Sequence, residues 1–433
     1  MVRKCIGLLV PTLVIMMLVL SGCSASKVGS QDQTIDGQTP LPGNAAPIEL
    51  TFWNSFGGGE GDFLEQIVQN FNASQKAVIV KQLRLESNEY YVKLSTALSS
   101  GKGPDVAVAH VDRISPFVKA KQILPLERLA SDAGFDFNEI DEFNVQSVSY
   151  NGKPFAIPLD THFQMLYYNK DILKKAGLLN EDDTPKLGDT TPEGFIRMLK
   201  QIQTMVPGVQ PLAVNTPYFQ EPFLNLYYEA GGELLNQDGT KSAIHNDKAL
   251  KVLQFYQQLY ASHLADLYDK TPWDSFHNGK AALWFGGVWE AGHHLSEPSL
   301  SVGIIPIPSI FGSPVHWGSS HTLVIPAYVT PEKQRAAMIF MKYFSEIGGV
   351  VWGQAGHVPA NRAVVQSAEY QQLPYRKLFI EARQHVKFAP QTDKYATIFT
   401  TLSEDLQSIV LGGLDPEEGL AALEKKLNDI LAN

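Results

Sequence analysis

The sequence predicts an α/β protein whose folded part is divided into two lobes. From residue 48 onward, short apolar runs alternate with segments whose apolar residues recur every three or four positions. This alternation is typical of strands that alternate with amphipathic helices. The chain has 433 residues. Even without the first 47, it is longer than one ordinary hydrophobic core supports, so two domains or lobes are expected.

The first series of elements lies between residues 48 and 110. Short apolar and β-branched runs predict strands at 48–54, 78–85 and 105–110. Between them, apolar residues spaced by three or four positions predict helices over 62–71 and 91–98. This order of strands and helices indicates a largely parallel sheet.

The second series begins near residue 154. Strand-like runs occur at 155–160, 281–287 and 301–307. Three helices begin with a threonine or aspartate followed by proline and glutamate, which is a typical N-terminal cap. The predicted helices are 169–176, one that begins at Thr191, 246–263, 330–345 and one that begins at Asp415.

The N-terminus carries a targeting signal. Two basic residues precede an apolar run over 6–20, which suits a secretory signal and is short for a membrane span. The string LSGC at 20–23 resembles the bacterial lipobox, in which a peptidase cuts before the cysteine and the thiol receives a lipid. We therefore expect a signal peptide at 1–22 and an extracytoplasmic protein anchored to the bacterial cell membrane through lipid on Cys23. The alternative is an ordinary signal peptide with an incidental cysteine.

Composition excludes several classes of protein. Residues 23–47 are rich in Ser, Gly, Gln, Asp and Pro and are expected to form a flexible tether after the lipidated cysteine. The formal net charge is −10 and there is no basic stripe, so nucleic acid is not an expected partner. Of the two cysteines, Cys5 leaves with the signal peptide and Cys23 is lipidated. The mature chain therefore has no thiol for a disulfide, a metal site or a nucleophile.

Six short sequence strings, taken in order, resemble a known protein family, although no single string is specific for it. They are FWNSF (52–56), GKGPDVAVAHVDR (101–113), NGKPFAIPLDTHFQMLYYNKDILKKAGL (151–178), TPYF (216–219), NGKAALWFGGVW (278–289) and GHVPANR (356–362). Their order and spacing resemble the family 1 extracellular solute-binding proteins of ABC importers, which include the maltose- and glycerol-3-phosphate-binding proteins. The resemblance covers the chain from residue 48 onward.

The resemblance implies an α/β fold of the two-lobed, type II periplasmic-binding-protein kind, with a hinge and a ligand cleft between the lobes. Chain crossings near Asp160 and His321 match the hinge strands of the family. It further implies a monomeric, non-enzymatic protein without cofactor that binds a carbohydrate, an oligosaccharide in particular, and delivers it to the transmembrane subunits of an ABC permease. By analogy, lobe 1 is 48–158 plus 322–370 and lobe 2 is 159–321 plus 371–433.

A carbohydrate site needs aromatic rings for the apolar faces of the sugar and polar side chains for its hydroxyls. In the maltose-binding relatives a carboxylate stands where His162 stands here, which argues against maltose itself. The alternative to ligand binding is a position in the hydrophobic core for Trp53, Trp273 and Trp317. For His162 the alternative is a hydrogen bond within the hinge. The ligand-binding residues that the resemblance and the strand ends indicate are Trp53, Ser55, Asp112, Asp160, His162, Tyr218, Phe219, Trp273, Trp289, Trp317, Gly318, His357 and Tyr395.

Two other functions compete with transport. A secreted carbohydrate hydrolase needs a pair of carboxylates, which Asp112 and Asp160 could form. The sequence has neither a Gly-x-Ser-x-Gly nor a His-Glu-x-x-His motif. His293 and His294 are adjacent and lack the spacing of a metal clamp, so no metal site is expected. A surface lipoprotein with a structural or adhesive role is the other alternative.

Overall fold

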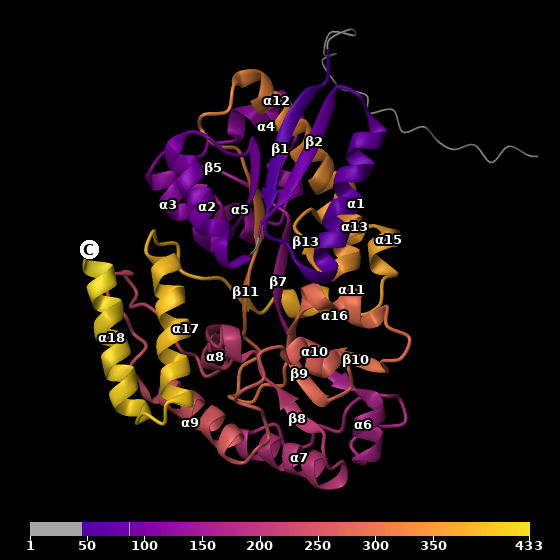
Figure 1. Ribbon diagram of the computed structural model, residues 1–433, viewed down its shortest axis with the longest axis vertical. Helices are drawn as coiled ribbons and strands as arrows, with labels where there is room; N and C mark the ends of the chain where they lie inside the picture. Colours follow the sequence, from indigo (N-terminus) through magenta and orange to yellow (C-terminus); the bar gives the residue numbers. More distant parts are fainter. Residues whose placement is uncertain (1–45, 86) are drawn as a thin grey trace, which may run out of the picture. The chain divides into compact units, whose positions relative to one another are not determined.

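The computed structural model describes residues 46–85 and 87–433 (Figure 1). The signal peptide, the lipidation site at Cys23 and the tether up to residue 45 lie outside the described residues. None of the described helices combines the length and the apolar character needed to cross a membrane.

The first sheet has five strands in the order β2-β1-β3-β12-β6. Its first three strands in the chain are parallel, as the sequence predicts, and β12 is antiparallel to both of its neighbours. Helices α1 (Gly58–Ser74) and α2 (Ser87–Ser100) connect the parallel strands. The strands are β1 (Ile48–Asn54), β2 (Val78–Arg84), β3 (Val106–His110), β6 (Ile157–Pro158) and β12 (His321–Val324).

The second sheet is built around β7 (Asp160–Asn169), in the order β14-β11-β7-β9-β8. Strand β7 is antiparallel to β9, β10, β11 and β13. All its residues are buried, so its sequence lacks the alternation of a half-exposed strand. For this reason the predicted strand ends at residue 160, where the observed strand begins. The other strands are β8 (Gln210–Ala213), β9 (Ala281–Gly287), β10 (Val302–Ile305), β11 (His316–Ser319), β13 (Val358–Pro359) and β14 (Val386–Lys387).

The remaining elements cover these sheets. Two of the three predicted caps are confirmed: Thr191 accepts a hydrogen bond from the backbone of Gly194, and Asp415 accepts from Glu417 and Glu418. The third is wrong, because Thr330 precedes α12 without a side-chain hydrogen bond to the helix. A small hairpin joins β4 (Ser149–Tyr150) and β5 (Lys153–Pro154). Short 3₁₀ turns are η1 (Val111–Arg113), η2 (Phe137–Glu139), η3 (Thr216–Tyr218) and η4 (Val288–Glu290), and a π-helical turn η5 spans Phe344–Gly348. The other helices are α3 (Ile114–Lys119), α4 (Glu127–Asp132), α5 (Glu142–Ser147), α6 (Lys170–Lys175), α7 (Pro192–Met205), α8 (Gln220–Glu229), α9 (Asp247–Ala261), α10 (Pro272–His277), α11 (Ala291–Leu295), α12 (Pro331–Tyr343), α13 (Gly349–Ala355), α14 (Arg362–Gln366), α15 (Ala368–Gln371), α16 (Arg376–Arg383), α17 (Tyr395–Leu411) and α18 (Pro416–Ala432).

Two of the places where the chain crosses between the sheets are adjacent to each other. The chain leaves the first sheet at Leu159, between β6 and β7, and returns at Ser320, between β11 and β12. The backbone N–H of Leu159 donates to the carbonyl of His321 at 2.8 Å, so the two crossing segments are hydrogen-bonded to each other. Each sheet has its own large hydrophobic core, and helices α17 and α18, side by side in Figure 1, contribute to the second one.

Candidate functional site

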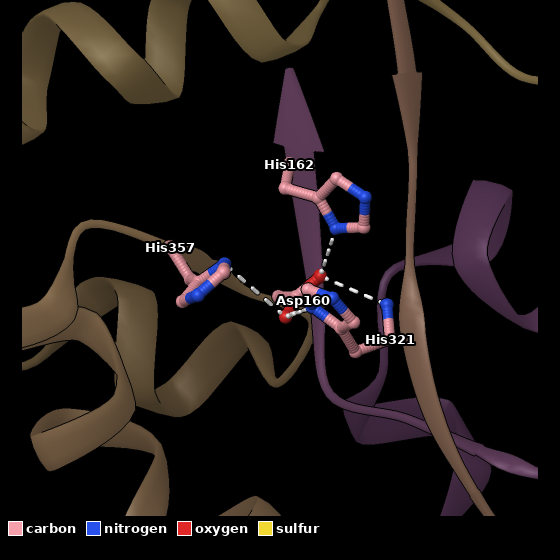
Figure 2. Close-up of side chains that lie close together, drawn as sticks. All are labelled: Asp160, His162, His321 and His357. Carbon is pink, nitrogen blue, oxygen red and sulfur yellow. Dashed lines mark hydrogen bonds and ion pairs between the residues drawn. The ribbon is translucent and has the colours of Figure 1, made fainter. Parts of the chain in front are cut away.

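Four side chains meet where the chain crosses between the sheets: Asp160, His162, His321 and His357 (Figure 2). We call them the Asp160 cluster. Asp160 and His162 are two residues apart on β7, so both lie on the same face of that strand. His321 is the first residue of β12. His357 directly precedes β13, which pairs with the start of β7, and backbone pairing therefore brings its side chain to the carboxylate.

The carboxylate of Asp160 is the centre of the cluster. Its Oδ1 lies 3.1 Å from Nδ1 of His162 and accepts the backbone N–H of His321, also at 3.1 Å. Its Oδ2 lies 2.8 Å from Nδ1 of His321 and accepts the indole N–H of Trp352 at 2.6 Å. Nδ1 of His357 is 3.4 Å from the same oxygen. The side chains of the cluster are at most 5% exposed.

A further shell of residues fixes the imidazole rings. Nε2 of His357 lies 3.2 Å from a carboxylate oxygen of Glu60, whose side chain is 18% exposed. The His357 ring stacks on Trp352 with 4.1 Å between centroids and 5° between planes. Phe56 contacts the His321 ring edge-to-face at 4.7 Å. These contacts leave the rings little freedom to rotate away from Asp160.

Burial decides which of these groups carry charge. Burial alone would raise the pKa of the Asp160 carboxyl, but its contacts with His321, His357 and His162 hold that pKa well below its usual range. Burial lowers the pKa of His321 to about 3 and that of His357 well below its usual range, and Asp160 offsets only part of this effect. At neutral pH the cluster therefore contains an ionised Asp160 carboxylate, and the imidazoles of His321 and His357 are neutral.

A second polar group lies on the second sheet and was missed by the sequence analysis. It consists of Gln164 on β7, Asn215 before η3 and Glu221 on α8, and we call it the Glu221 group. The side-chain amides of Gln164 and Asn215 donate to the same Glu221 oxygen at 3.4 and 3.5 Å. Burial raises the pKa of Glu221 to about 8. Among the described residues, the buried amide oxygens of Gln164 and Asn215 have no hydrogen-bond partner.

The structure brings some of the predicted site residues to these two groups. The ring of Trp289 meets that of His162 edge-to-face, 5.5 Å between centroids. Tyr218 lies three residues before Glu221 and is 39% exposed. Asp112 accepts a hydrogen bond from Ser319 at 3.5 Å. Burial raises the pKa of Asp112, while the adjacent Arg113 opposes the rise.

Other predicted residues lie in different surroundings. Phe219, Trp317 and Tyr395 belong to the second hydrophobic core and are at most 6% exposed. Trp273 on α10 is partly buried against a separate cluster that contains Phe276 and Trp284. Gly318 lies against β7, where a Cβ atom would come within 2.5 Å of the carbonyl oxygen of His162. Trp53 is half-buried near the end of β1, and Ser55 follows that strand.

The sequence contained a partial signal for the Asp160 cluster. Asp160, His162 and His357 were expected as ligand-binding residues and the crossings were placed near Asp160 and His321, whereas Glu60 and Trp352 had no local pattern that pointed to the site. The expectation of no metal site considered only His293 and His294. Four described residues, those of the Asp160 cluster, offer ligand atoms within 4.8 Å of one another.

Comparison with known proteins identifies related chains. Residues 66–377 match the model of a family described as bacterial extracellular solute-binding protein. The arabinooligosaccharide-binding protein of Bacillus subtilis is 29% identical over 255 residues, which are 57% of this chain and 53% of that protein. The chain thus spans about half the length of that relative. The maltodextrin-binding protein MdxE of the same organism is 23% identical over 403 residues, covering 88% of this chain and 87% of MdxE.

The fold has close structural counterparts. The maltose-bound MalE3 of T. maritima superposes with a TM-score of 0.79 at 20% identity, covering 88% of this chain and all of that one. The chain therefore has the two-domain periplasmic-binding-protein fold, with α/β domains, that the sequence predicts. The related proteins named here are binding proteins, in agreement with the expectation of a non-enzymatic function.

Proposed function

We propose that this chain, which belongs to the bacterial extracellular solute-binding protein family, captures an oligosaccharide between two closing lobes and delivers it to an ABC permease. The family acts outside the cytoplasm, and this location is the premise for the rest of the proposal. The lobe boundaries that we propose are 48–158 plus 322–370 and 159–321 plus 371–433.

The observation that carries the proposal is the Glu221 group. Two buried amide oxygens, on Gln164 and Asn215, have no hydrogen-bond partner among the described residues. An unpaired buried acceptor costs about 1–3 kcal/mol, so such groups are expected to have a partner in the working protein. Sugar hydroxyls are donors that suit them. Tyr218, beside the group, offers an accessible aromatic face for the apolar side of a sugar ring.

The identity of the ligand class rests on the relatives. Proteins similar to this chain over half or more of its length are named for arabino-oligosaccharides and maltodextrins. We propose that Asp112 contacts the sugar from the first lobe and that Tyr218 and Trp289 contact it from the second. Trp53 and Ser55, at the end of β1, extend the same site in our proposal.

The hydrolase alternative is less well supported. A carboxylate pair for glycoside cleavage must reach the substrate from both sides of the scissile bond. Asp160 has a fully buried side chain and both its oxygens accept hydrogen bonds from neighbouring residues. It is therefore a poor partner for Asp112 in such a pair, which supports a protein that binds its sugar without converting it.

We further propose that the mature protein is held at the membrane by lipid on Cys23 and acts as a monomer. A tether over 23–47 would let the folded part reach the permease while it stays anchored. The acyl chains attached at one cysteine suffice for stable anchoring, where a single chain would be marginal.

A thermal-shift screen tests the proposal. The protein is melted alone and with arabino-oligosaccharides, maltodextrins and disaccharides of other linkages, and glycerol 3-phosphate serves as a charged comparison. A sugar at one hundred times its dissociation constant should stabilise the folded state by about 2.7 kcal/mol. Release of reducing sugar is followed in the same samples. If no sugar raises the melting temperature, or the stabilising sugar is cleaved, the proposal is wrong.

A further inference from the structure

We propose that the Asp160 cluster binds one divalent transition metal ion, such as Zn²⁺. The bound ion links the two adjacent chain crossings to each other. The ligands are the carboxylate of Asp160 and, on each of the three histidines, the Nδ1 atom that faces this carboxylate. This site is separate in chemistry from sugar capture and does not depend on it.

The first argument is a count of hydrogen-bonding groups. A carboxylate offers about four lone-pair positions. The indole N–H of Trp352 and the backbone N–H of His321 can only donate, and both point at Asp160. Two positions remain, and three imidazole nitrogens face them. Hydrogen bonds alone therefore cannot satisfy the group, whatever tautomer each ring adopts.

The unsatisfied atom is identifiable. Nδ1 of His357 is buried and has no hydrogen-bond partner among the described residues, although it lies 3.4 Å from Oδ2 of Asp160. A metal ion removes the conflict, because it accepts one lone pair from each of the three rings and one from the carboxylate. Trp352 and the backbone of His321 keep their acceptors on Asp160.

Glu60 supplies the second argument. Histidine ligands of metals commonly donate their other ring N–H to a carboxylate, which fixes the tautomer and orients the ring. Nε2 of His357 lies 3.2 Å from Glu60, while Nδ1 faces the centre of the cluster (Figure 2). Donation from Nε2 to Glu60 leaves a lone pair on Nδ1 that faces the Asp160 carboxylate, and a metal ion between them would pair with both.

The geometry fits a small ion with four ligands. In a tetrahedral zinc site with bonds of about 2.0–2.1 Å, neighbouring ligand atoms lie roughly 3.3–3.4 Å apart. The carboxylate oxygens lie 3.1, 2.8 and 3.4 Å from Nδ1 of His162, His321 and His357. All four ligand atoms lie within 4.8 Å of one another, which is close enough for a single ion to contact each of them. Four protein ligands leave no open position, which is typical of structural zinc sites.

The position of the site defines its role. Asp160 and His162 belong to β7 in the second sheet, and His321 belongs to β12 in the first. An ion bound to all of them ties the two crossings together. As metal ligands, Asp160, His162 and His357 position the crossing and do not touch the sugar.

Direct metal binding tests the inference. The full chain, carrying a tag without histidine, is stripped with a chelator and then titrated with Zn²⁺ or Co²⁺. We expect one ion per chain by elemental mass spectrometry, a higher melting temperature with Zn²⁺, and the intense visible absorption of tetrahedral Co²⁺. Glu60→Gln should weaken Zn²⁺ binding 10- to 100-fold, because Glu60 only orients a ligand.

A second histidine group provides the matched control. His277, His293 and His294 lie together, with Nδ1 atoms of His277 and His294 3.1 Å apart. His357→Gln should abolish the Co²⁺ absorption, and His293→Gln should leave it unchanged. The reverse result would move the site to the second group and overturn the inference.

Two further outcomes decide the remaining cases. If the wild-type chain neither holds an ion nor changes its melting temperature at saturating Zn²⁺, the inference is wrong. If His357→Gln does not fold, the stoichiometry of the wild type and the affinity of Glu60→Gln decide the matter. Sugar binding is measured separately, with and without chelator, so that failure of metal binding is distinguished from failure of the proposed transport function.

Discussion

Nδ1 of His321 lies 2.8 Å from Oδ2 of Asp160, and the backbone N–H of the same histidine donates to Oδ1 at 3.1 Å. One residue of β12 thus engages both oxygens of the first residue of β7. Because these strands belong to different sheets, the pair joins the two segments by which the chain crosses between them. The contact is buried, so water cannot replace either partner at low cost.

This pairing predicts a large effect of a nearly isosteric change. Asp160→Asn replaces one of the two carboxylate oxygens by an amide N–H₂, so either the indole N–H of Trp352 or the backbone N–H of His321 loses its acceptor in the buried cluster. We expect the free energy of unfolding, measured by urea denaturation in chelator, to fall by about 1–3 kcal/mol. Asp393→Asn, which removes a surface ion pair with Lys119, should cost less than about 1 kcal/mol. Equal losses for the two variants would contradict the prediction.

The aromatic contact to the sugar predicts a loss of affinity. Trp289 is half-buried beside His162 and offers a stacking surface in the proposed site. Trp289→Ala should weaken binding of the stabilising sugar by about 1–3 kcal/mol, as measured by calorimetric titration. The melting temperature without sugar is the control. A large drop in that temperature with unchanged affinity would assign Trp289 to the core.

The Glu221 carboxyl predicts a pH-dependent difference in stability. Burial raises its pKa from the usual 4.5 to about 8 in the folded protein. Between these pH values the unfolded chain loses this proton and the folded chain keeps it, so wild-type stability declines as pH rises. Glu221→Gln cannot ionise, and its melting temperature relative to wild type should therefore increase from pH 5 to pH 9.

An exposed glutamate serves as the comparison for that experiment. Glu404→Gln on α17 changes the same charge at the surface. Its melting temperature relative to wild type should vary little over the same pH range. If the Glu221→Gln difference were flat between pH 5 and pH 9, the raised pKa would be wrong.

Closure of the lobes predicts a change in size. A sugar that contacts both lobes binds the closed state better and shifts the population towards it. Small-angle scattering should give a smaller radius of gyration with the stabilising sugar than without it. A non-binding sugar at the same concentration controls for the solvent. An unchanged radius at saturation would exclude closure as the transport signal.

Lipidation predicts the fate of a cysteine variant. The LSGC string at 20–23 motivates the expectation that the chain is cut before Cys23 and acylated there. Cys23→Ala should accumulate as uncleaved precursor or as protein released from the membrane, seen by fractionation and intact mass. Recovery of this variant as a processed, membrane-bound lipoprotein would refute the assignment.

Local sequence pattern was enough to predict several elements of the fold. The strands at 48–54 and 281–287 were placed correctly because a run of seven mostly apolar residues that includes aromatic side chains favours a strand over a longer helix. The capping residues Thr191 and Asp415 marked helix starts correctly, because each side chain accepts a hydrogen bond from a backbone N–H only two or three residues further along the chain. The ordered strings also identified the fold class, which the structural counterparts confirm.

The Asp160 cluster and the Glu221 group form through contacts between distant parts of the chain, which no local pattern predicts. Strand β7 is buried on both faces, so its polar residues stood in no alternating pattern that would have marked Gln164. Trp352 reaches Asp160 across 192 residues of sequence, and Glu60 reaches His357 across 297. Local periodicity reports which face of an element is buried. It carries no information on which distant segment covers that face, because strand pairing and chain crossings choose the neighbour.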